Sequence, residues 1–318
     1  MKILVYIQHE EDKINPVSLE ALKGAQEVAT QAGGNISAIT FNSKIASQLT
    51  SYNISEVILA EDDKLNSFNP LYYLKALETI AKAESPDIVV FGHTYEARDW
   101  VPRLSVRLDI PMISDCIGFK KEEELTFIRS IYQGKINSDM VVNDGSFILS
   151  FQSGSFRADE LQSGSAEIRN ESLDLSDVNE TISPDEKFQE TDQAVDLTQA
   201  DVIVSIGRGI GKEENIELAR KLSKTLGGEI ASSRPVVDAG WLESSRQVGS
   251  SGQTVSPKLY LALGISGAIQ HVVGMKGSKN IVVINKDSNA PLFEIADYGV
   301  VGDIFEIVPK LTEKLQNS

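Results

Sequence analysis

The sequence predicts an α/β protein built from two doubly wound, parallel-sheet (Rossmann-like) domains. In each half of the chain, short apolar runs alternate with segments of helical periodicity, and an acidic polar stretch separates the two halves. Alternating strands and helices are typical of βαβ units joined by right-handed crossovers. A chain of 318 residues fits two domains at roughly 100–200 residues each.

The first half begins with the apolar run KILVYI (2–7), which is typical of a strand buried on both faces of a parallel sheet. Residues 18–33 have helical spacing with a serine at the start and a glycine at the end, so they predict a helix. After about residue 113 the strands become shorter, which predicts an antiparallel edge or hairpin. The other expected elements of this half are the strands NISAITF, SEVILAED and PDIVVFGH, and the helices IASQLTSYN, PLYYLKALETIAKAES and ARDWVPRLSVRLD.

The middle of the chain, 158–198, is rich in Asp, Glu, Ser, Thr and Gln and poor in aromatic residues. This composition is typical of a linker. We place the domain boundary here, which gives an N-terminal domain over 1–190, with the acidic linker at its end, and a C-terminal domain over 191–318. The stretch SAEIRNESLDL within the linker is compatible with an edge strand.

Composition excludes several classes of protein. The net charge of −16 argues against a nucleic-acid partner, and no apolar run reaches the roughly 18–20 residues of a membrane span, so the protein is not expected to be membrane-inserted. The strand-like N-terminus lacks the features of a signal peptide, which predicts a cytoplasmic protein. One cysteine and three scattered histidines predict neither a disulfide nor a metal site.

The second half reads as another parallel sheet, with strands ADVIVSIG, KLYLALG, NIVVINKD and YGVVGD. Ligands of open α/β sheets bind at the carboxyl ends of the strands. Those ends carry the clusters IGRGIG, SSRP, QVGSSGQT, GISGAIQH and INKD. Glycine turns admit a ligand close to the backbone, helix N-termini bind phosphate, and arginines add charge. Together they predict a site for a pyrophosphate-containing dinucleotide.

Taken singly, each cluster has a simpler interpretation. GRGIG departs from G-x-G-x-x-G, Asp303 suits the N-cap of the closing helix, and His271 suits a satisfied side chain. The residues alone leave NAD, FAD and a CoA-like ligand open. We find no Ser-His-Asp arrangement, no paired carboxylates and no metal ligands, so the cofactor is expected to perform the chemistry and the chain is not expected to be an enzyme by itself.

Longer sequence signatures narrow the choice among these ligands. The segment Gln247–Asp303 contains ISGAIQH…GM and INKD…ADYG, and GRG, SSRP and DAGW stand upstream; PRLSVRLDIPMISDCIGF lies in the first half. In these signatures the chain resembles the electron transfer flavoprotein alpha subunit family. The resemblance implies a nucleotide-hydrolase-like N-terminal domain, an FAD-binding C-terminal domain, and a heterodimer with a beta subunit. It also implies electron transfer from flavin dehydrogenases, such as the acyl-CoA dehydrogenases of fatty acid beta-oxidation, to a membrane-bound quinone oxidoreductase.

The resemblance also implies roles for the polar half of the cofactor site. Arg208 is expected near the FAD diphosphate or adenosine, and Asn285 and Asp303 near the adenosine half. The pyrophosphate and ribityl contacts are expected from the start of the helix in GISGAIQH, at Ser266, Gly267, Ala268 and Gln270.

A second group is expected around the flavin ring. Ser233 and Arg234 match a Ser-Arg pair beside the ring, where the guanidinium stabilises reduced, anionic flavin. His271 matches a histidine that donates a hydrogen bond to flavin O2. The loop beside the ribityl chain and the ring is expected to contain Gln247, Val248, Gly249, Ser250 and Ser251.

One position departs from the family. Members usually have Gln-Thr-Gly after QVG, where this chain has Ser250, Ser251 and Gly252. The threonine hydroxyl reaches flavin N5. Ser251 keeps the hydroxyl but lacks the methyl group that restricts the rotamer.

Three alternatives stay open. The first is an electron-bifurcating complex, in which the beta subunit binds a second FAD. The second is an NAD-dependent enzyme of the deoxyhypusine-synthase-like fold, which would need a pocket lysine, with Lys276 and Lys286 as candidates. The third is a nucleotide-sensing module without a redox role.

Overall fold

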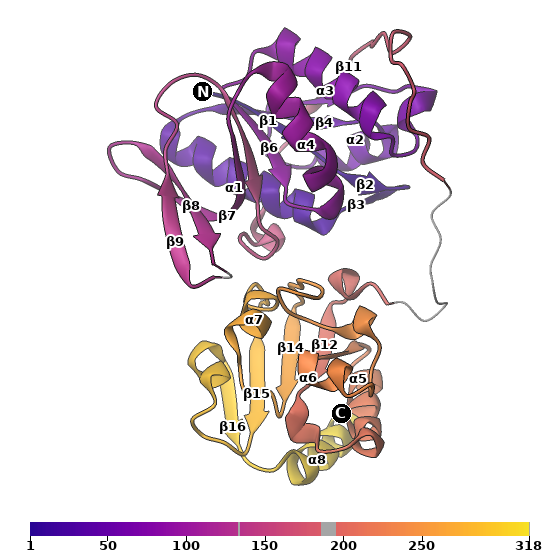
Figure 1. Cartoon of the computed structure of the whole chain (residues 1–318), viewed down its shortest axis with the longest axis vertical. Coiled ribbons are helices and arrows are strands. Elements are labelled where there is room, and N and C mark those ends of the chain that lie inside the picture. Colours follow the sequence, from indigo (N-terminus) through magenta and orange to yellow (C-terminus); the bar gives the residue numbers. More distant parts are fainter. Residues whose placement is uncertain (133, 186–194, 318) are drawn as a thin grey trace. The chain divides into compact units, whose positions relative to one another are not determined.

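The computed structural model describes residues 1–132, 134–185 and 195–317 (Figure 1). Apart from residues 132 and 134, the described residues divide into two compact units, the first over 1–131 and 135–185 and the second over 195–317. The expected boundary near residue 190 lies outside the described residues. Within the described ranges, no helix is both long enough and apolar enough to cross a membrane.

A mixed nine-stranded sheet forms the centre of the first unit, in the order β11-β5-β4-β1-β6-β10-β7-β8-β9. Neighbours from β11 to β7 pair in parallel, while β8 and β9 pair antiparallel, which confirms the expected hairpin at the edge. The strands are β1 (Lys2–Tyr6), β4 (Asn35–Thr40), β5 (Glu56–Leu59), β6 (Ile88–Gly92), β7 (Met112–Lys121), β8 (Leu125–Ile131), β9 (Ile136–Met140), β10 (Phe147–Phe151) and β11 (Glu167–Asn170), with a small separate ribbon of β2 (His9–Glu10) and β3 (Lys13–Ile14).

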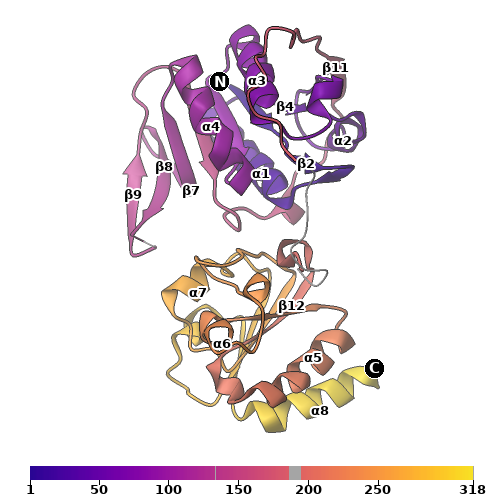
Figure 2. The same cartoon turned by 45° about the vertical axis from the view of Figure 1, so that its right-hand side comes forward.

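Helices cover both faces of this sheet, as a doubly wound fold requires (Figure 2). Buried residues of α1 (Pro16–Ala32) and α2 (Ser43–Leu49) pack on one face, and those of α3 (Pro70–Glu84) and α4 (Tyr95–Leu108) on the other. The first helix begins before the expected Ser18. Asn15 caps it by accepting from the Val17 amide, and Pro16 occupies the first turn, where a missing N–H costs nothing.

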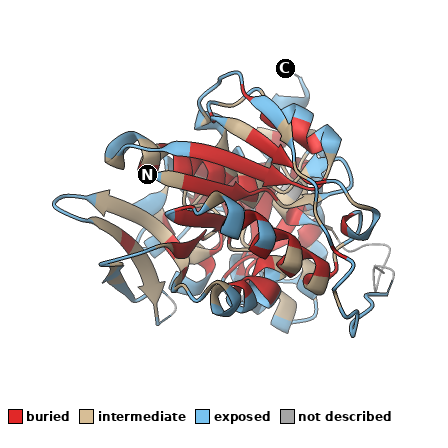
Figure 3. Cartoon of the chain, turned by 90° about the horizontal axis from the view of Figure 1, so that it is seen from above, coloured by how far each residue is buried: buried red, intermediate tan, exposed pale blue. Residues whose placement is uncertain are grey.

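Burial follows the position of each strand in the sheet. Every residue of β6 and β10 is buried, whereas the β8–β9 hairpin is mostly half-buried or exposed (Figure 3). Strands in the middle of a sheet covered on both faces read as continuous apolar runs. This explains why the apolar runs in the sequence correctly predicted the central strands.

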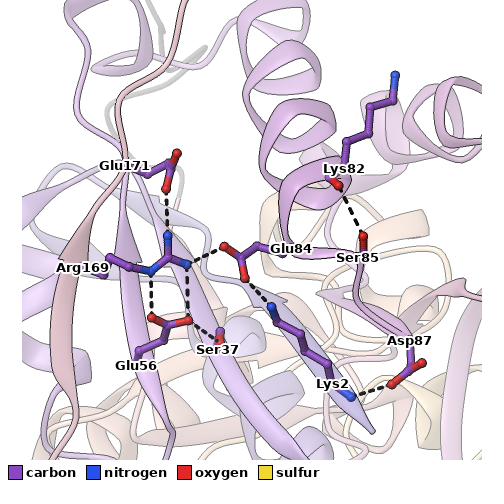
Figure 4. A network of polar contacts seen from close by, with 9 residues as sticks. All are labelled: Lys2, Ser37, Glu56, Lys82, Glu84, Ser85, Asp87, Arg169 and Glu171. Carbon is purple, nitrogen blue, oxygen red and sulfur yellow. Dashed lines mark hydrogen bonds and ion pairs between the residues drawn. The ribbon is translucent and has the colours of Figure 1, made fainter.

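The acidic segment is not a free linker over its described first part. Its strand β11 pairs in parallel with β5 at the edge of the sheet, as the edge-strand expectation suggested. The guanidinium of Arg169 on β11 forms ion pairs with three carboxylates (Figure 4). Its nitrogens lie 2.8 Å from a Glu56 oxygen, 2.6 Å from a Glu84 oxygen and 2.8 Å from a Glu171 oxygen. The amine of Lys2 joins the same network through Glu84.

Beyond β11 the chain continues along α3. Leu175 is buried in the apolar cluster on that face, and the Tyr72 hydroxyl donates to Glu180 at 2.9 Å. These contacts were not evident from the sequence, because the few apolar residues that pack against the unit are spread among many acidic residues. The expectation of a solvated linker is therefore wrong as far as Glu180.

The second unit is a parallel five-stranded sheet in the order β13-β12-β14-β15-β16. Its strands are β12 (Val202–Ile206), β13 (Glu229–Ser232), β14 (Leu259–Leu263), β15 (Ile281–Asn285) and β16 (Tyr298–Val301). One face packs against α5 (Ile216–Thr225), α6 (Arg234–Asp238) and α8 (Ile304–Gln316), and α7 (Ile269–Val273) follows β14. The two α/β units confirm the predicted fold class, with the mixed edge of the first sheet added.

Candidate functional site

The second unit changes its winding direction between β12 and β14. The chain runs from β12 outward to β13 on one side, then returns to place β14 on the other side. At the carboxyl ends of these two strands, the Gly209 amide donates to the Gly264 carbonyl at 3.1 Å. A Cβ atom at Gly207 would lie 2.3 Å from that carbonyl oxygen, so only glycine allows the two turns to meet. This is where open α/β sheets bind ligands.

The loop after β14 offers free backbone donors. Within the described residues, the amides of Ser266, Gly267 and Ala268 make no hydrogen bond, and Ser266 and Ala268 are exposed. Gly267 has a φ of +93°, and a Cβ atom there would lie 2.4 Å from the Leu292 nitrogen. The helix α7 that follows has only five residues, so its dipole is small. The backbone amides of the loop are therefore the groups that can donate hydrogen bonds to an anion.

The loop after α6 is joined to the start of α7. The Ser250 amide donates to the Gln270 carbonyl at 2.7 Å, and the Val248 amide donates to the Ser232 carbonyl at the end of β13 at 2.9 Å. The structure therefore brings the expected ring-side loop next to the expected pyrophosphate loop. Gly249 is buried between them, and Gln270 and Ser250 are exposed.

Ser251 keeps a usable hydroxyl. The Gln247 side-chain nitrogen donates to Ser251 Oγ at 3.0 Å, which leaves the hydroxyl proton free to donate elsewhere. Gln247 is buried and Ser251 is exposed. The geometry therefore suits a hydrogen bond from Ser251 to a ligand acceptor, the role expected toward flavin N5.

His271 is enclosed by the protein. Its Nδ1 lies 3.0 Å from the Val248 carbonyl oxygen, and its Nε2 lies 2.9 Å from the Tyr260 hydroxyl. Because a carbonyl only accepts, Nδ1 carries the proton and Nε2 accepts from Tyr260. Burial lowers the pKa of His271 to about 4, opposed by the bond to Val248, so the ring is neutral. In this arrangement neither nitrogen has a free N–H for flavin O2, and that expected role stays a prediction.

The two expected arginines reach solvent at the carboxyl edge of the sheet. Arg234 begins α6, and its side chain is 68% exposed and lies 3.4 Å from Asp238. Arg208 lies in the turn after β12 and is exposed. Ser233, which is buried, precedes Arg234 at the end of β13. Both guanidinium groups are accessible to an anionic ligand.

Asn285 and Asp303 have structural tasks in this state. Asn285 donates to the Ile265 carbonyl at 2.9 Å and accepts from the Asp287 amide at 3.0 Å, so it fixes two loops. Asp303 caps α8 by accepting from the Phe305 amide at 2.8 Å, as the simpler interpretation of the sequence expected. Their predicted contacts to adenosine remain predictions.

The first unit contains a serine, histidine and aspartate cluster that the sequence analysis missed. The Ser150 hydroxyl lies 2.9 Å from His93 Nδ1, and Asp115 lies 3.7 Å from His93 Nε2. Ser150 is 1% exposed and also accepts from the Asp115 amide, so its hydroxyl is not accessible as a nucleophile. No metal-binding group of His, Cys, Asp and Glu occurs among the described residues.

Two further residues of the second unit escaped the sequence analysis. Tyr260 on β14 and Ser205 on β12 are both fully buried and belong to the sheet beneath His271. The available signal was a polar group inside each apolar run, in LYLALG and VIVSIG. A polar group in a strand buried on both faces requires a partner.

Comparison with known proteins decides the family. Residues 3–176 match the electron transfer flavoprotein domain, and residues 196–276 match the electron transfer flavoprotein FAD-binding domain. The electron transfer flavoprotein subunit alpha of Bacillus subtilis is 35% identical over 99% of this chain and 97% of its own length. This chain belongs to the electron transfer flavoprotein alpha subunit family.

Other members of the family carry different names. Protein FixB of Clostridium saccharobutylicum is 33% identical over 97% of this chain and 94% of its own length. The lactate dehydrogenase (NAD(+),ferredoxin) subunit LctC of Acetobacterium woodii is 31% identical over 99% of this chain and 77% of its own length. The suspected family and the FAD cofactor are thereby confirmed.

The geometry fits FAD at the carboxyl edge of the second sheet. The free amides of 266–268 suit the pyrophosphate, and the exposed guanidinium groups suit negative charge. FAD supplies the redox chemistry when it is bound. The protein binds and orients it, and the neutral His271 and the hydroxyl of Ser251 belong to the same connected loops.

Proposed function

We propose that this alpha subunit pairs with an electron transfer flavoprotein beta subunit and carries electrons from a flavin dehydrogenase, such as an acyl-CoA dehydrogenase, to a quinone oxidoreductase. The main support is the composition of the site. Its loops offer amides, a hydroxyl and guanidinium groups, and its histidine is neutral and fully engaged. Such groups bind and tune a cofactor, and they provide no acid or base for a second substrate.

The residue roles follow this proposal. Ser266, Gly267, Ala268 and Gln270 would hold the pyrophosphate and ribityl groups, and Ser233, Arg234 and Ser251 would face the ring. Gln247, Val248, Gly249 and Ser250 would shape the loop beside it. Arg208, Asn285 and Asp303 would lie toward the adenosine half.

The test is reconstitution with the beta subunit. The purified heterodimer should contain FAD, accept electrons from an acyl-CoA dehydrogenase and its substrate, and pass them to a quinone oxidoreductase. FAD that stays oxidised in the presence of an acyl-CoA dehydrogenase and its substrate would contradict that donor. Failure to reduce the quinone oxidoreductase would contradict the acceptor.

A second candidate function is electron bifurcation. It is favoured by the similarity to the LctC subunit, whose name couples lactate, NAD and ferredoxin. The FAD content separates the two functions, because a bifurcating heterodimer would hold a second FAD in the beta subunit. One FAD per heterodimer and no response to NADH would support the simple carrier.

The NAD-dependent alternative finds little support in the site. Both candidate lysines, Lys276 and Lys286, are exposed. A lysine that forms a Schiff base needs a lowered pKa, which usually comes from burial. Family membership also points away from this alternative.

A further inference from the structure

A line of buried polar side chains runs from the ring-side loop into the centre of the second sheet. His271 contacts Tyr260 at 2.9 Å, and both belong to the buried interior, at 5% and 0% exposure. Tyr260 packs among apolar residues such as Ile203 and Val283. A tyrosine at such a position loses hydration, so its hydroxyl needs partners inside the protein.

Ser205 lies next along this line, on the strand beside Tyr260. Its hydroxyl is buried and has no hydrogen-bond partner among the described residues. Burial raises the pKa of Tyr260, and the Ser205 hydroxyl close to the phenol opposes this rise, although the two hydroxyls do not meet the geometry of a hydrogen bond in this arrangement. Leaving a buried hydroxyl unpaired is unfavourable, because the group loses its hydration without gaining a partner in the protein. The position of Ser205 is therefore best explained by a second arrangement in which its hydroxyl is used.

The two hydroxyls can serve either protonation state of the imidazole, because each can both donate and accept. With a neutral ring, Tyr260 donates to His271 Nε2. With a proton on Nε2, that nitrogen must donate, so the Tyr260 oxygen accepts and the Tyr260 proton turns to Ser205. Nδ1 keeps its bond to the Val248 carbonyl in both states.

We propose that Ser205 and Tyr260 form a hydroxyl relay that lets the buried His271 gain or lose one proton at Nε2 with every donor matched. The proton comes from solvent, and only the N–H bond forms or breaks. The proposal rests on the proposed function, because a negatively charged reduced cofactor would favour the added proton. His271 then acts on the cofactor through its charge, and Tyr260 is a positioning residue.

The surroundings of His271 isolate this proton. The titratable group that faces the ring is Tyr260 on β14, and the loop after α6 contributes the Val248 carbonyl. Within the described residues, no charged side chain contributes to the pKa of His271. Without an added negative charge, burial keeps the ring neutral, as the pKa of about 4 indicates.

The resting state can be tested in the flavin-free full chain by nitrogen NMR of labelled histidine, because the chain has only three histidines. The wild type should show the Nδ1–H tautomer with Nε2 as a hydrogen-bonded acceptor. Tyr260→Phe should move the Nε2 signal to that of an unbonded nitrogen, while Tyr298→Phe, at an exposed tyrosine, should change nothing. An Nε2–H tautomer, or an unchanged Nε2 signal in Tyr260→Phe, would overturn the relay.

The charged state can be tested in the FAD-loaded heterodimer by measuring the one-electron reduction potential against pH. If one proton accompanies the electron, the wild-type potential should fall by about 59 mV for each tenfold drop in proton concentration. Tyr260→Phe and Ser205→Ala should flatten this dependence, the tyrosine variant more strongly. Equal slopes in the wild type and in both variants would contradict the proposal. A heterodimer without FAD would contradict the proposed function alone, and the nitrogen spectra would still decide the resting state.

Discussion

Gln247 donates from Nε2 to Ser251 Oγ at 3.0 Å, and this bond fixes the oxygen while leaving the hydroxyl proton available. The orientation that a threonine methyl group would impose is supplied here by a neighbouring amide. Ser251→Ala should therefore lower the one-electron potential of bound FAD, because a donor to the reduced ring is lost. A neutral hydrogen bond of about 1 kcal/mol corresponds to about 40 mV for one electron.

Ser251→Thr is the matched control, since it keeps the hydroxyl. Its potential should stay close to that of the wild type in the same spectroelectrochemical titration. If the alanine and threonine variants shift the potential equally, the hydroxyl of Ser251 does not act on the flavin.

Arg234→Ala should lower the FAD potential with little effect on stability. The side chain is 68% exposed, and its contact with Asp238 is worth little in water. Loss of a positive charge beside the ring disfavours the reduced anion. Arg220→Ala on α5, another exposed arginine, provides the control and should leave the potential unchanged. A similar reduction potential in the Arg234 and Arg220 variants would show that Arg234 does not lie beside the flavin ring.

Arg169→Ala should destabilise the first unit by about 1–2 kcal/mol, because three carboxylates lose their shared partner and Glu84 is largely buried. The effect stays this small because the Arg169 side chain is 37% exposed, so water screens its ion pairs. Urea denaturation measures the change. Arg157→Ala, which breaks exposed pairs with Asp159 and Glu160, should cost less than about 0.5 kcal/mol. Equal effects of the two variants would show that the Arg169 network adds nothing.

Acid should weaken the same network. The hydrogen bond from Arg169 lowers the pKa of Glu56 below its ordinary 4.5, against the effect of burial. A carboxyl group whose pKa is lower in the folded state stabilises the protein above its unfolded pKa, and this stabilisation is lost as pH falls through the folded value. Unfolding titrations from pH 6 downward should thus show a loss of stability below about pH 4.5 that Glu56→Gln reduces. An identical acid slope in that variant would contradict the assignment.

The second unit should lose stability over a higher pH range. Burial lowers the pKa of His271 from 6.5 to about 4, so the unfolded chain binds a proton between these values and the folded chain does not. The contribution of neutral His271 to the free energy of unfolding is fully present above the unfolded pKa and is lost as pH drops toward the folded pKa. The free energy of unfolding should fall by about 2 kcal/mol between pH 7 and pH 5. His271→Asn should flatten this slope in flavin-free protein. A slope that persists in the variant would assign it to other groups.

The central strands and the location of the site could be predicted from the sequence, because both follow from the pattern of apolar runs along the chain. Central strands such as KILVYI are buried on both faces, so their composition alone identified them. Clusters at strand ends predicted the site because parallel strands bring their carboxyl ends to one edge. The sequence was compatible with an edge strand in SAEIRNESLDL but did not predict the Arg169 network that anchors it, because Arg169 binds carboxylates that are 85 and 113 residues away in the chain. Nor did it indicate that His271 is enclosed by Tyr260 and Val248, since that pairing depends on how the loops fold back.

The most direct test of the account is the visible absorption spectrum of this chain co-purified with the proposed beta subunit, followed by stepwise reduction. We predict the bands of bound FAD, reduction to an anionic flavin, and loss of that behaviour in His271→Asn and Arg234→Ala. A colourless complex that binds NAD instead would contradict the account and remove the flavin roles of every residue at the carboxyl edge of the second sheet.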